Sequence, residues 1–157
     1  SVDPLDHILQ REPTPDSGLP VGTIRIPEIG VHWTVVEGVS RNDLKSGAGH
    51  MPTTPLPGQP GNAVVSGHRT TYGAPFNELD ELVPGDLIYW DSPVIGTHTY
   101  AVTELIVVRP TELWVTDPRP GAWLTLTTCN PEFSAAERLI VFAELVDGPN
   151  AAVILDT

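Results

Sequence analysis

The chain has 157 residues, a formal net charge of −12 at pH 7 and an isoelectric point near 4.5, and it is long enough for one domain with a sizeable core. A chain this acidic lacks the clustered lysines and arginines of a nucleic-acid interface, so we expect no nucleic-acid partner. No apolar run reaches the roughly 18 residues of a transmembrane helix, and membrane attachment is expected only through an anchor outside this sequence.

The only cysteine, Cys129, narrows the chemistry further. One thiol cannot form an intrachain disulfide, and it cannot supply a zinc site built on several thiolates. We predict no metal and no other cofactor. The 14 glycines and 17 prolines are spread between β-branched runs, which indicates many short strands and turns rather than disorder.

The N-terminal part of the chain divides into a lead-in and a first hairpin. Residues 1–20 are polar and rich in proline, which is typical of a lead-in or linker, and we place the folded domain at residues 21–157. A first strand is predicted at 21–26, closed by Pro27, and a second at 31–36. The turn between them predicts that the two strands form a hairpin.

Residues 40–74 contain two histidines in different settings. A helical turn capped by Ser40 is predicted at 40–44. His50 follows among glycines and prolines, where we expect it to hold a loop through hydrogen bonds to the backbone; a direct part in an active site is the alternative. An apolar strand at 62–66 runs through Gly67 and delivers His68 at its end.

The central region predicts a helix and two strands. Phe76, Leu79 and Leu82 have the spacing of one helical face, so a short helix is expected at 75–82. Its acidic residues are interpreted as the solvated side rather than as a cation site, since no ligand loop surrounds them. Strands are predicted at 87–90 and 97–108. We expect His32 to be a surface or partly buried residue of its strand and His98 to be a surface residue of its strand.

Two further strands are predicted around Cys129, at 122–129 and 138–146, because both runs are rich in β-branched and aromatic residues. Pro131 lies between them and cannot donate to a ladder, so Cys129 ends one strand and Arg138 opens the next. If the strands pair, the Cys129 thiolate and the Arg138 guanidinium lie at the same end of the pair. The thiolate is a nucleophile, and the guanidinium is a planar cationic donor that can stabilise a developing oxyanion. A lone cysteine is more often a small buried hydrophobic residue, and this remains the alternative.

The run Thr125-Leu126-Thr127-Thr128-Cys129, followed nine residues later by Arg138, resembles the T-L-x-T-C…R signature of the sortases, cysteine transpeptidases of Gram-positive cell surfaces. The stretch GHRTTYGAPF that begins at Gly67 is similar to the loop that follows the sortase histidine. The resemblance covers roughly residues 21–146 and is greatest to the class E, actinobacterial housekeeping group. It implies a mainly β fold, an eight-stranded sortase-type β-barrel with one or two short helices, which agrees with the roughly eight strands expected here.

The resemblance also implies the site and its reaction. His68, Cys129 and Arg138 would be catalytic, and Thr128, Tyr72 and Trp114 are candidate substrate-binding residues, with packing as the alternative for Thr128 and Trp114. The reaction would be cleavage of a Leu-Ala/Pro-x-Thr-Gly sorting signal between Thr and Gly through a thioacyl enzyme. The acyl group would then pass to a peptidoglycan-precursor amine or a pilin amine outside the cytoplasm.

Three other functions remain open on the sequence. The chain could encode a pilin-polymerising sortase, another cysteine acyl-enzyme hydrolase, or a non-enzymatic β-barrel binding module. A papain-like enzyme is disfavoured because the C-G-S-C-W surroundings are absent and because His68 precedes Cys129 in the chain.

Overall fold

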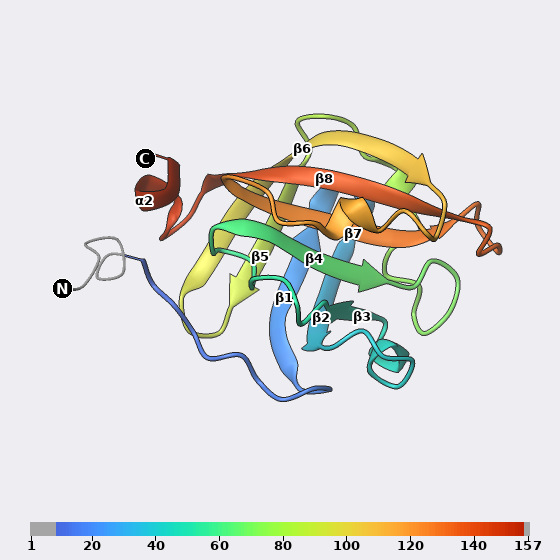
Figure 1. The fold of residues 1–157 in the computed structure, drawn as a ribbon, viewed down its shortest axis with the longest axis horizontal. Coiled ribbons are helices and arrows are strands. Elements are labelled where there is room, and N and C mark those ends of the chain that lie inside the picture. The colour runs from blue at the N-terminus through green and yellow to red at the C-terminus, as the bar shows by residue number, and fades with distance from the viewer. Residues whose placement is uncertain (1–8, 156–157) are drawn as a thin grey trace.

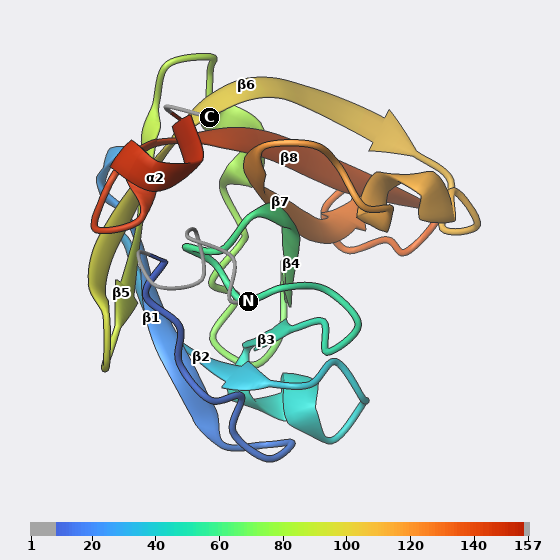
Figure 2. The same ribbon diagram turned by 60° about the vertical axis from the view of Figure 1, so that its left-hand side comes forward.

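The computed structural model describes residues 9–155, and within them eight strands close into one barrel in the order β1-β2-β3-β4-β7-β8-β6-β5. The strands are β1 Pro20–Ile26, β2 Val31–Glu37, β3 Ala48–His50, β4 Gly61–Gly67, β5 Leu87–Ser92, β6 Gly96–Val108, β7 Ala122–Asn130 and β8 Glu137–Asp147. Figure 2 shows them as a ring. The predicted mainly β barrel is confirmed.

The helices are short and lie in the connections. One α-helix, α2 Ala151–Leu155, follows β8, and four 3₁₀ turns complete the described chain: η1 Pro27–Ile29, η2 Asp43–Ser46, η3 Leu79–Glu81 and η4 Leu113–Thr116. No helix within residues 9–155 is long and apolar enough to cross a membrane.

The barrel interior is filled by one face of each strand, because side chains alternate between the two faces. Leu124 and Leu126 of β7 belong to the main core with Val65 of β4 and Val141 of β8. The intervening residues of the same strands therefore point outward. The outer face of β8 carries a second cluster, in which Ile140 and Phe142 pack with other apolar side chains.

Strand directions divide the barrel into two ends. β4 and β7 are parallel, and β7 and β8 are antiparallel, so the end of β4, the end of β7 and the start of β8 meet at one rim. The turn between β1 and β2 belongs to the same rim, because β1 runs antiparallel to β5, which pairs with β6. We call this end the β7–β8 rim. Figure 1 shows α2 at the opposite end of the barrel from the β7–β8 loop.

Three local expectations need correction. The strand β3 was not predicted, because only glycine fits at its centre: a Cβ on Gly49 would lie 2.0 Å from the carbonyl oxygen of Gly38. Residues 75–82 form overlapping turns with only η3 as a 3₁₀ helix, although Phe76, Leu79 and Leu82 are buried as that prediction required. The turn capped by Ser40 forms three residues later, at η2, where the Ser40 hydroxyl accepts from the Asp43 amide at 3.1 Å.

The β1–β2 hairpin is confirmed by the antiparallel pairing of Ile24 with Trp33. Residues 9–19 contain no helix or strand, and they pack against the barrel. Asn150 and the backbone of Gln10 exchange hydrogen bonds of 2.7 and 2.8 Å, which attaches the lead-in to the end of the barrel that carries α2. His98 at this end is fully buried, so the prediction of a surface residue was wrong, whereas His32 is exposed as expected.

Candidate active site

Cys129, His68 and Arg138 lie at the β7–β8 rim on the outer face of the barrel. Cys129 and Arg138 are direct cross-strand partners, and residues opposite each other on antiparallel strands share a face. His68 follows β4 by one residue, and its amide continues the ladder by donating to the Gly47 carbonyl at 2.9 Å. By strand alternation His68 also points outward, and all three residues are partly exposed.

The ends of β4 and β7 are fixed together on both faces. On the outer face the hydroxyls of Ser66 and Thr127 are hydrogen-bonded at 2.7 Å. On the inner face Thr128 is 3% exposed, and its hydroxyl donates to the Gly67 carbonyl at 2.8 Å. Thr128 therefore packs under the site and holds the residue before His68 close to Cys129; direct contact with substrate stays a prediction.

The His68 ring is oriented by the loop that follows it. The Thr71 hydroxyl lies 3.2 Å from Nδ1, and the ring of Tyr72 is 5.0 Å from the imidazole, centroid to centroid. The Phe76 amide donates to the His68 carbonyl at 3.1 Å. With Nδ1 occupied by Thr71, Nε2 is the ring nitrogen left to exchange a proton with a reacting group.

Arg138 holds the β7–β8 loop with one nitrogen. Its Nη1 donates to the carbonyls of Ala135 and Glu137 at 3.2 and 3.1 Å. Within residues 9–155 no acceptor is bonded to Nε or Nη2, so the side of the guanidinium that carries these two nitrogens can meet a substrate oxygen.

Arg69 is the residue that the sequence reasoning missed. It is 5% exposed, and its Nη1 donates to the Cys129 carbonyl at 3.1 Å and to the Asn130 amide oxygen at 2.9 Å. Nε donates to the Asn77 carbonyl at 3.2 Å, and Nη2 lies 3.2 Å from Asp80. One side chain thus connects the residue next to His68 with the backbone of Cys129. Its place beside His68 in the sequence was the only available signal.

Exposed aromatic residues lie on three loops at or beside this site. Tyr72 lies on the loop after β4 and is 50% exposed, and Trp114 in η4 is 52% exposed with its ring 6.3 Å from that of Phe142. Phe133 of the β7–β8 loop, at 84%, was not predicted. Contacts of Tyr72 and Trp114 with a substrate stay predictions.

The loop between β6 and β7 is held over the outer face of the barrel. The Asn62 amide donates to the carbonyls of Val115 and Asp117 at 3.1 Å each, and it accepts from the Thr125 hydroxyl at 2.6 Å. A depression of about 650 Å³ lies between this loop and the start of β4. It is lined by Thr53, Thr54, Pro55, Pro60, Gly61, Asn62, Thr116, Pro118, Arg119 and Pro120.

His50 has a structural role, as the loop-holding interpretation expected. Its ring is 1% exposed, with Nδ1 2.6 Å from the buried carboxylate of Glu37 and Nε2 2.8 Å from the Pro55 carbonyl. Both ring nitrogens are engaged within the protein, so His68 stays the candidate for proton transfer. Within residues 9–155 no three His, Cys, Asp or Glu side chains are grouped as metal ligands. The metal-free reaction stays a prediction.

Known proteins resemble the chain over most of its length. The model of the Sortase domain matches residues 24–146. Sortase SrtE1 of Streptomyces coelicolor is 31% identical over 79% of this chain and 40% of its own length, and Sortase A of Streptococcus agalactiae is 33% identical over 84% and 56%. The chain therefore spans about half the length of these curated relatives.

Solved structures support the same likeness in three dimensions. Sortase E from Streptomyces avermitilis superposes with a TM-score of 0.78 and 36% identity over 85% of this chain and 91% of the other. SrtF from Corynebacterium diphtheriae gives 0.81 and 28% over 88% and 90%. The structure of sortase E1 from S. coelicolor, with a tripeptide in its active site, gives 0.79 and 30% over 85% and 93%.

Proposed function

Since this chain belongs to the sortase family, we propose that it is a cysteine transpeptidase that acts through a thioacyl enzyme. The observation that carries the proposal is the cross-strand pairing of Cys129 with Arg138, next to a histidine at the end of the adjoining strand. A nucleophile, a proton donor and an oxyanion donor then lie at one rim, which are the three groups that acyl transfer requires.

In the first half-reaction the thiolate of Cys129 attacks the carbonyl carbon of the substrate threonine. The negative charge that develops on the oxygen is stabilised by Nε and Nη2 of Arg138, which have no partner within the described residues. As the carbon–nitrogen bond breaks, His68 gives its proton to the leaving amine. The product is a thioester between Cys129 and the acyl part of the substrate.

In the second half-reaction a new amine attacks the thioester. His68, now neutral, accepts the proton of the incoming nitrogen, a carbon–nitrogen bond forms and the carbon–sulfur bond breaks. Cys129 returns as the thiolate. The two half-reactions use the same three residues because the second is chemically the reverse of the first with a different amine.

The donor substrate is a sorting signal of the type Leu-Ala/Pro-x-Thr-Gly, cleaved between Thr and Gly. Its acyl part lies on the outer face of β4 and β7, where the β6–β7 loop and Trp114 form one wall. Tyr72, beside His68, contributes to the preference at the second position of the signal. The protein acts outside the cytoplasm, on secreted surface proteins and a peptidoglycan-precursor or pilin amine.

Mass spectrometry of the protein mixed with a panel of Leu-x-x-Thr-Gly peptides tests the proposal. We expect an adduct at Cys129 whose mass equals the peptide up to its threonine. Labelling by a small thiol-reactive probe at neutral pH separates the enzyme from a non-enzymatic barrel, since an inert structural cysteine labels slowly. Slow labelling together with the absence of any adduct across the panel would refute the proposed activity.

A further inference from the structure

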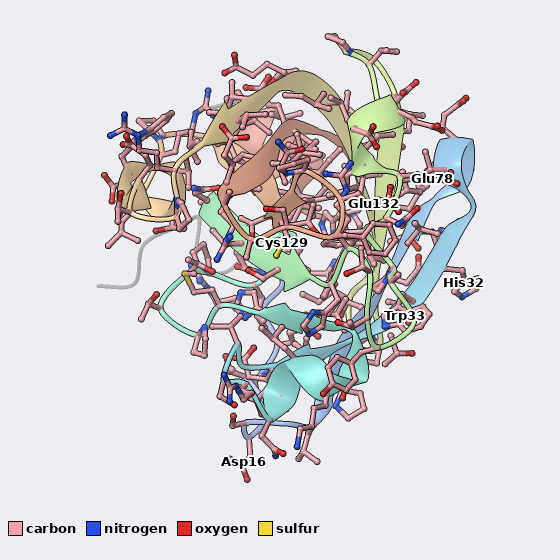
Figure 3. All side chains as sticks on the ribbon, turned by 90° about the vertical axis from the view of Figure 1, so that its right-hand side faces the viewer. Asp16, His32, Trp33, Glu78, Cys129 and Glu132 are labelled. Carbon is pink, nitrogen blue, oxygen red and sulfur yellow. The ribbon has the colours of Figure 1, made fainter. Side chains whose placement is uncertain are left out.

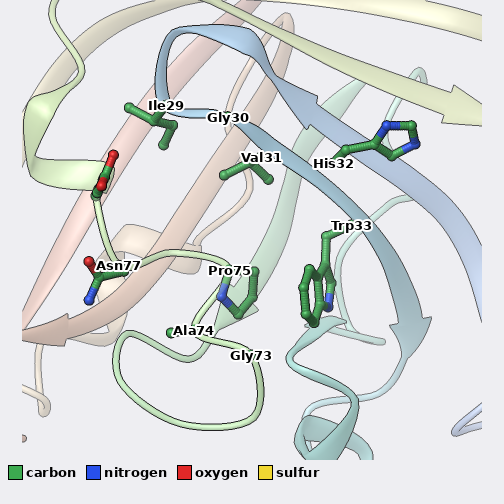
Figure 4. A pocket seen from close by; sticks show the side chains of 10 residues that line it. Ile29, Gly30, Val31, His32, Trp33, Gly73, Ala74, Pro75 and Asn77 are labelled. Atoms are coloured by element: carbon green, nitrogen blue, oxygen red, sulfur yellow. The ribbon is translucent and has the colours of Figure 1, made fainter.

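A second depression lies at the β7–β8 rim, and it shares no lining residue with the depression beside the β6–β7 loop. It has a volume of about 290 Å³ and separates the β1–β2 turn and the start of β2 from the segment that follows His68. Figure 4 shows it between Ile29 and Val31 on one wall and Ala74 and Pro75 on the other. We call it the rim pocket.

The rim pocket is connected to the catalytic residues by hydrogen bonds. Asn77 of its lining donates to Glu132 at 2.9 Å, and Glu132 lies in the loop between β7, which carries Cys129, and β8. The Asn77 carbonyl accepts from Arg69, which also binds the Cys129 carbonyl. In Figure 3, which looks onto the rim, Glu132, Glu78 and Trp33 lie on one side of Cys129.

One wall of the pocket is preformed and rigid. The Trp33 indole donates to the Ser46 carbonyl at 2.9 Å, which fixes the ring. A Cβ on Gly73, whose φ is +84°, would lie only 2.2 Å from that ring, so the loop after His68 passes close against it. Contacts within the protein therefore hold this wall in place, and a ligand that packs on it has little to order there.

The proposed transpeptidation requires such a place. The leaving amine takes its proton from His68 and the incoming amine returns one to His68, so both occupy the same side of Cys129 while the acyl group stays on the other. The segment that forms one wall of the rim pocket is the continuation of the His68 loop, because the Phe76 amide is bonded to the His68 carbonyl. Resting on the proposed function, we propose that the rim pocket binds the acceptor, a short peptide that carries the attacking amine.

The lining gives the acceptor its chemistry. Trp33, Val31 and Pro75 offer apolar contact to a peptide backbone, and the exposed carboxylate of Glu78 favours an acceptor with a positive charge besides the reacting amine. A volume of about 290 Å³ is at the lower limit of small-ligand pockets. This size fits two or three residues of a free peptide better than a lysine on the face of a folded protein, which needs a broad contact area.

The test separates acceptor binding from the first half-reaction. The thioacyl enzyme is formed with a Leu-Ala-x-Thr-Gly peptide. Water, hydroxylamine and one of two acceptor peptides, Gly-Gly-Lys or Gly-Gly-Glu, then compete as nucleophiles for it. Hydroxylamine is too small to need the pocket, so the ratio of peptide product to hydroxamate reports acceptor binding whatever the rate of acylation. A lysine-bearing folded protein is a third acceptor.

Glu78→Gln should reduce the preference for Gly-Gly-Lys over Gly-Gly-Glu by about two- to fivefold, the usual effect of an exposed ion pair. Its matched control is Glu81→Gln, an exposed acid outside the lining. Val31→Phe, which narrows the pocket, should lower the peptide-to-hydroxamate ratio at least about tenfold. Val94→Phe, at an exposed turn away from the rim, is its control.

The outcomes are distinct. If no thioacyl enzyme forms, the proposed function fails before the acceptor is tested. If it forms and reacts with hydroxylamine, unchanged ratios in both Glu78→Gln and Val31→Phe overturn the acceptor site. Preference for the folded protein over both tripeptides also overturns it. If Val31→Phe does not fold, Glu78→Gln decides alone: a reduced preference for Gly-Gly-Lys over Gly-Gly-Glu supports the acceptor site.

Discussion

Arg69 offers the strongest test of how the rim is assembled, and Arg69→Ala is the perturbation. Its guanidinium makes three hydrogen bonds, to Cys129, Asn130 and Asn77, and pairs with Asp80. Alanine removes all four contacts at once and leaves a space among buried groups, since Arg69 is only 5% exposed.

The expected loss follows from these contacts. A hydrogen bond from a charged donor contributes about 1.5–3 kcal/mol net, but the Cys129 and Asn77 carbonyls lie on partly exposed residues where water can replace the arginine. Asp80 is 55% exposed, so its charge is hardly stranded. We therefore expect a loss of about 3–5 kcal/mol in the free energy of unfolding, and a melting temperature lower by about 6–20 °C in a domain of this size.

Thermal melting and single-turnover acylation measure the two consequences. At a temperature where Arg69→Ala is still folded, its acylation rate should fall because His68 and Cys129 lose their common support. Arg69→Lys should regain part of the stability but little of the rate, since one ammonium cannot reach acceptors in several directions. Arg41→Ala, at an exposed arginine, is the control. A change of less than about 2 °C in melting temperature counts as neutral. If Arg69→Ala shows such a neutral change and also acylates at the native rate, the reasoning is wrong.

Three further substitutions test the catalytic assignment. Cys129→Ala should abolish adduct formation without loss of the folded state, seen by mass spectrometry and circular dichroism; residual turnover would exclude it as nucleophile. His68→Ala should lose kcat without marked loss of stability, whereas His50→Ala should chiefly lower the melting temperature, because His50 is bonded to Glu37 and Pro55. Arg138→Lys should recover only part of the roughly 10²–10³-fold loss expected for alanine, visible in kcat as well as kcat/KM; a change in KM alone would contradict an oxyanion role.

The barrel could be predicted largely because most of its strands carry their own pattern. β7 and β8 were placed to within a residue or so, since alternating apolar residues and Pro131 determine where the ladder stops. β3 has no such pattern: its three residues are defined by the close approach of Gly49 to Gly38, which depends on a partner strand. The helix α2 after β8 was missed too, because it is only five residues long and shows no helical pattern of its own.

The candidate site shows the same division. Cys129, His68 and Arg138 are strand-end residues, and the sequence predicts strand ends. Arg69 acts on the Cys129 carbonyl 60 positions along the chain, and that contact exists only once β4 and β7 lie parallel. Thr128 was ranked as a candidate from its place beside Cys129. Its side chain points into the barrel, which its residue type could not reveal.

The buried His98 predicts how stability depends on pH. Its Nε2 accepts from the Asn150 amide at 3.1 Å, so the neutral ring carries its proton on Nδ1, which is buried and has no partner within residues 9–155. Burial lowers the pKa of His98 below its ordinary value, although Asp147 opposes the shift.

Below about pH 6.5 the unfolded chain therefore binds a proton at His98 that the folded chain does not. As the pH is lowered, the free energy of unfolding decreases until the pH has passed below the pKa of His98 in the folded protein. Protonation of Nε2 would also break the bond to Asn150, which attaches α2 and the lead-in to the barrel. His98→Gln keeps an acceptor but cannot titrate, so its melting temperature should fall less between pH 7.5 and pH 5, which lie about 1 unit above and about 1.5 units below the ordinary pKa of histidine. His32→Gln, at an exposed histidine, should keep the native pH dependence. Equal pH dependence in His98→Gln and the native protein would mean that acid acts elsewhere in the chain, and the reasoning about His98 would be wrong.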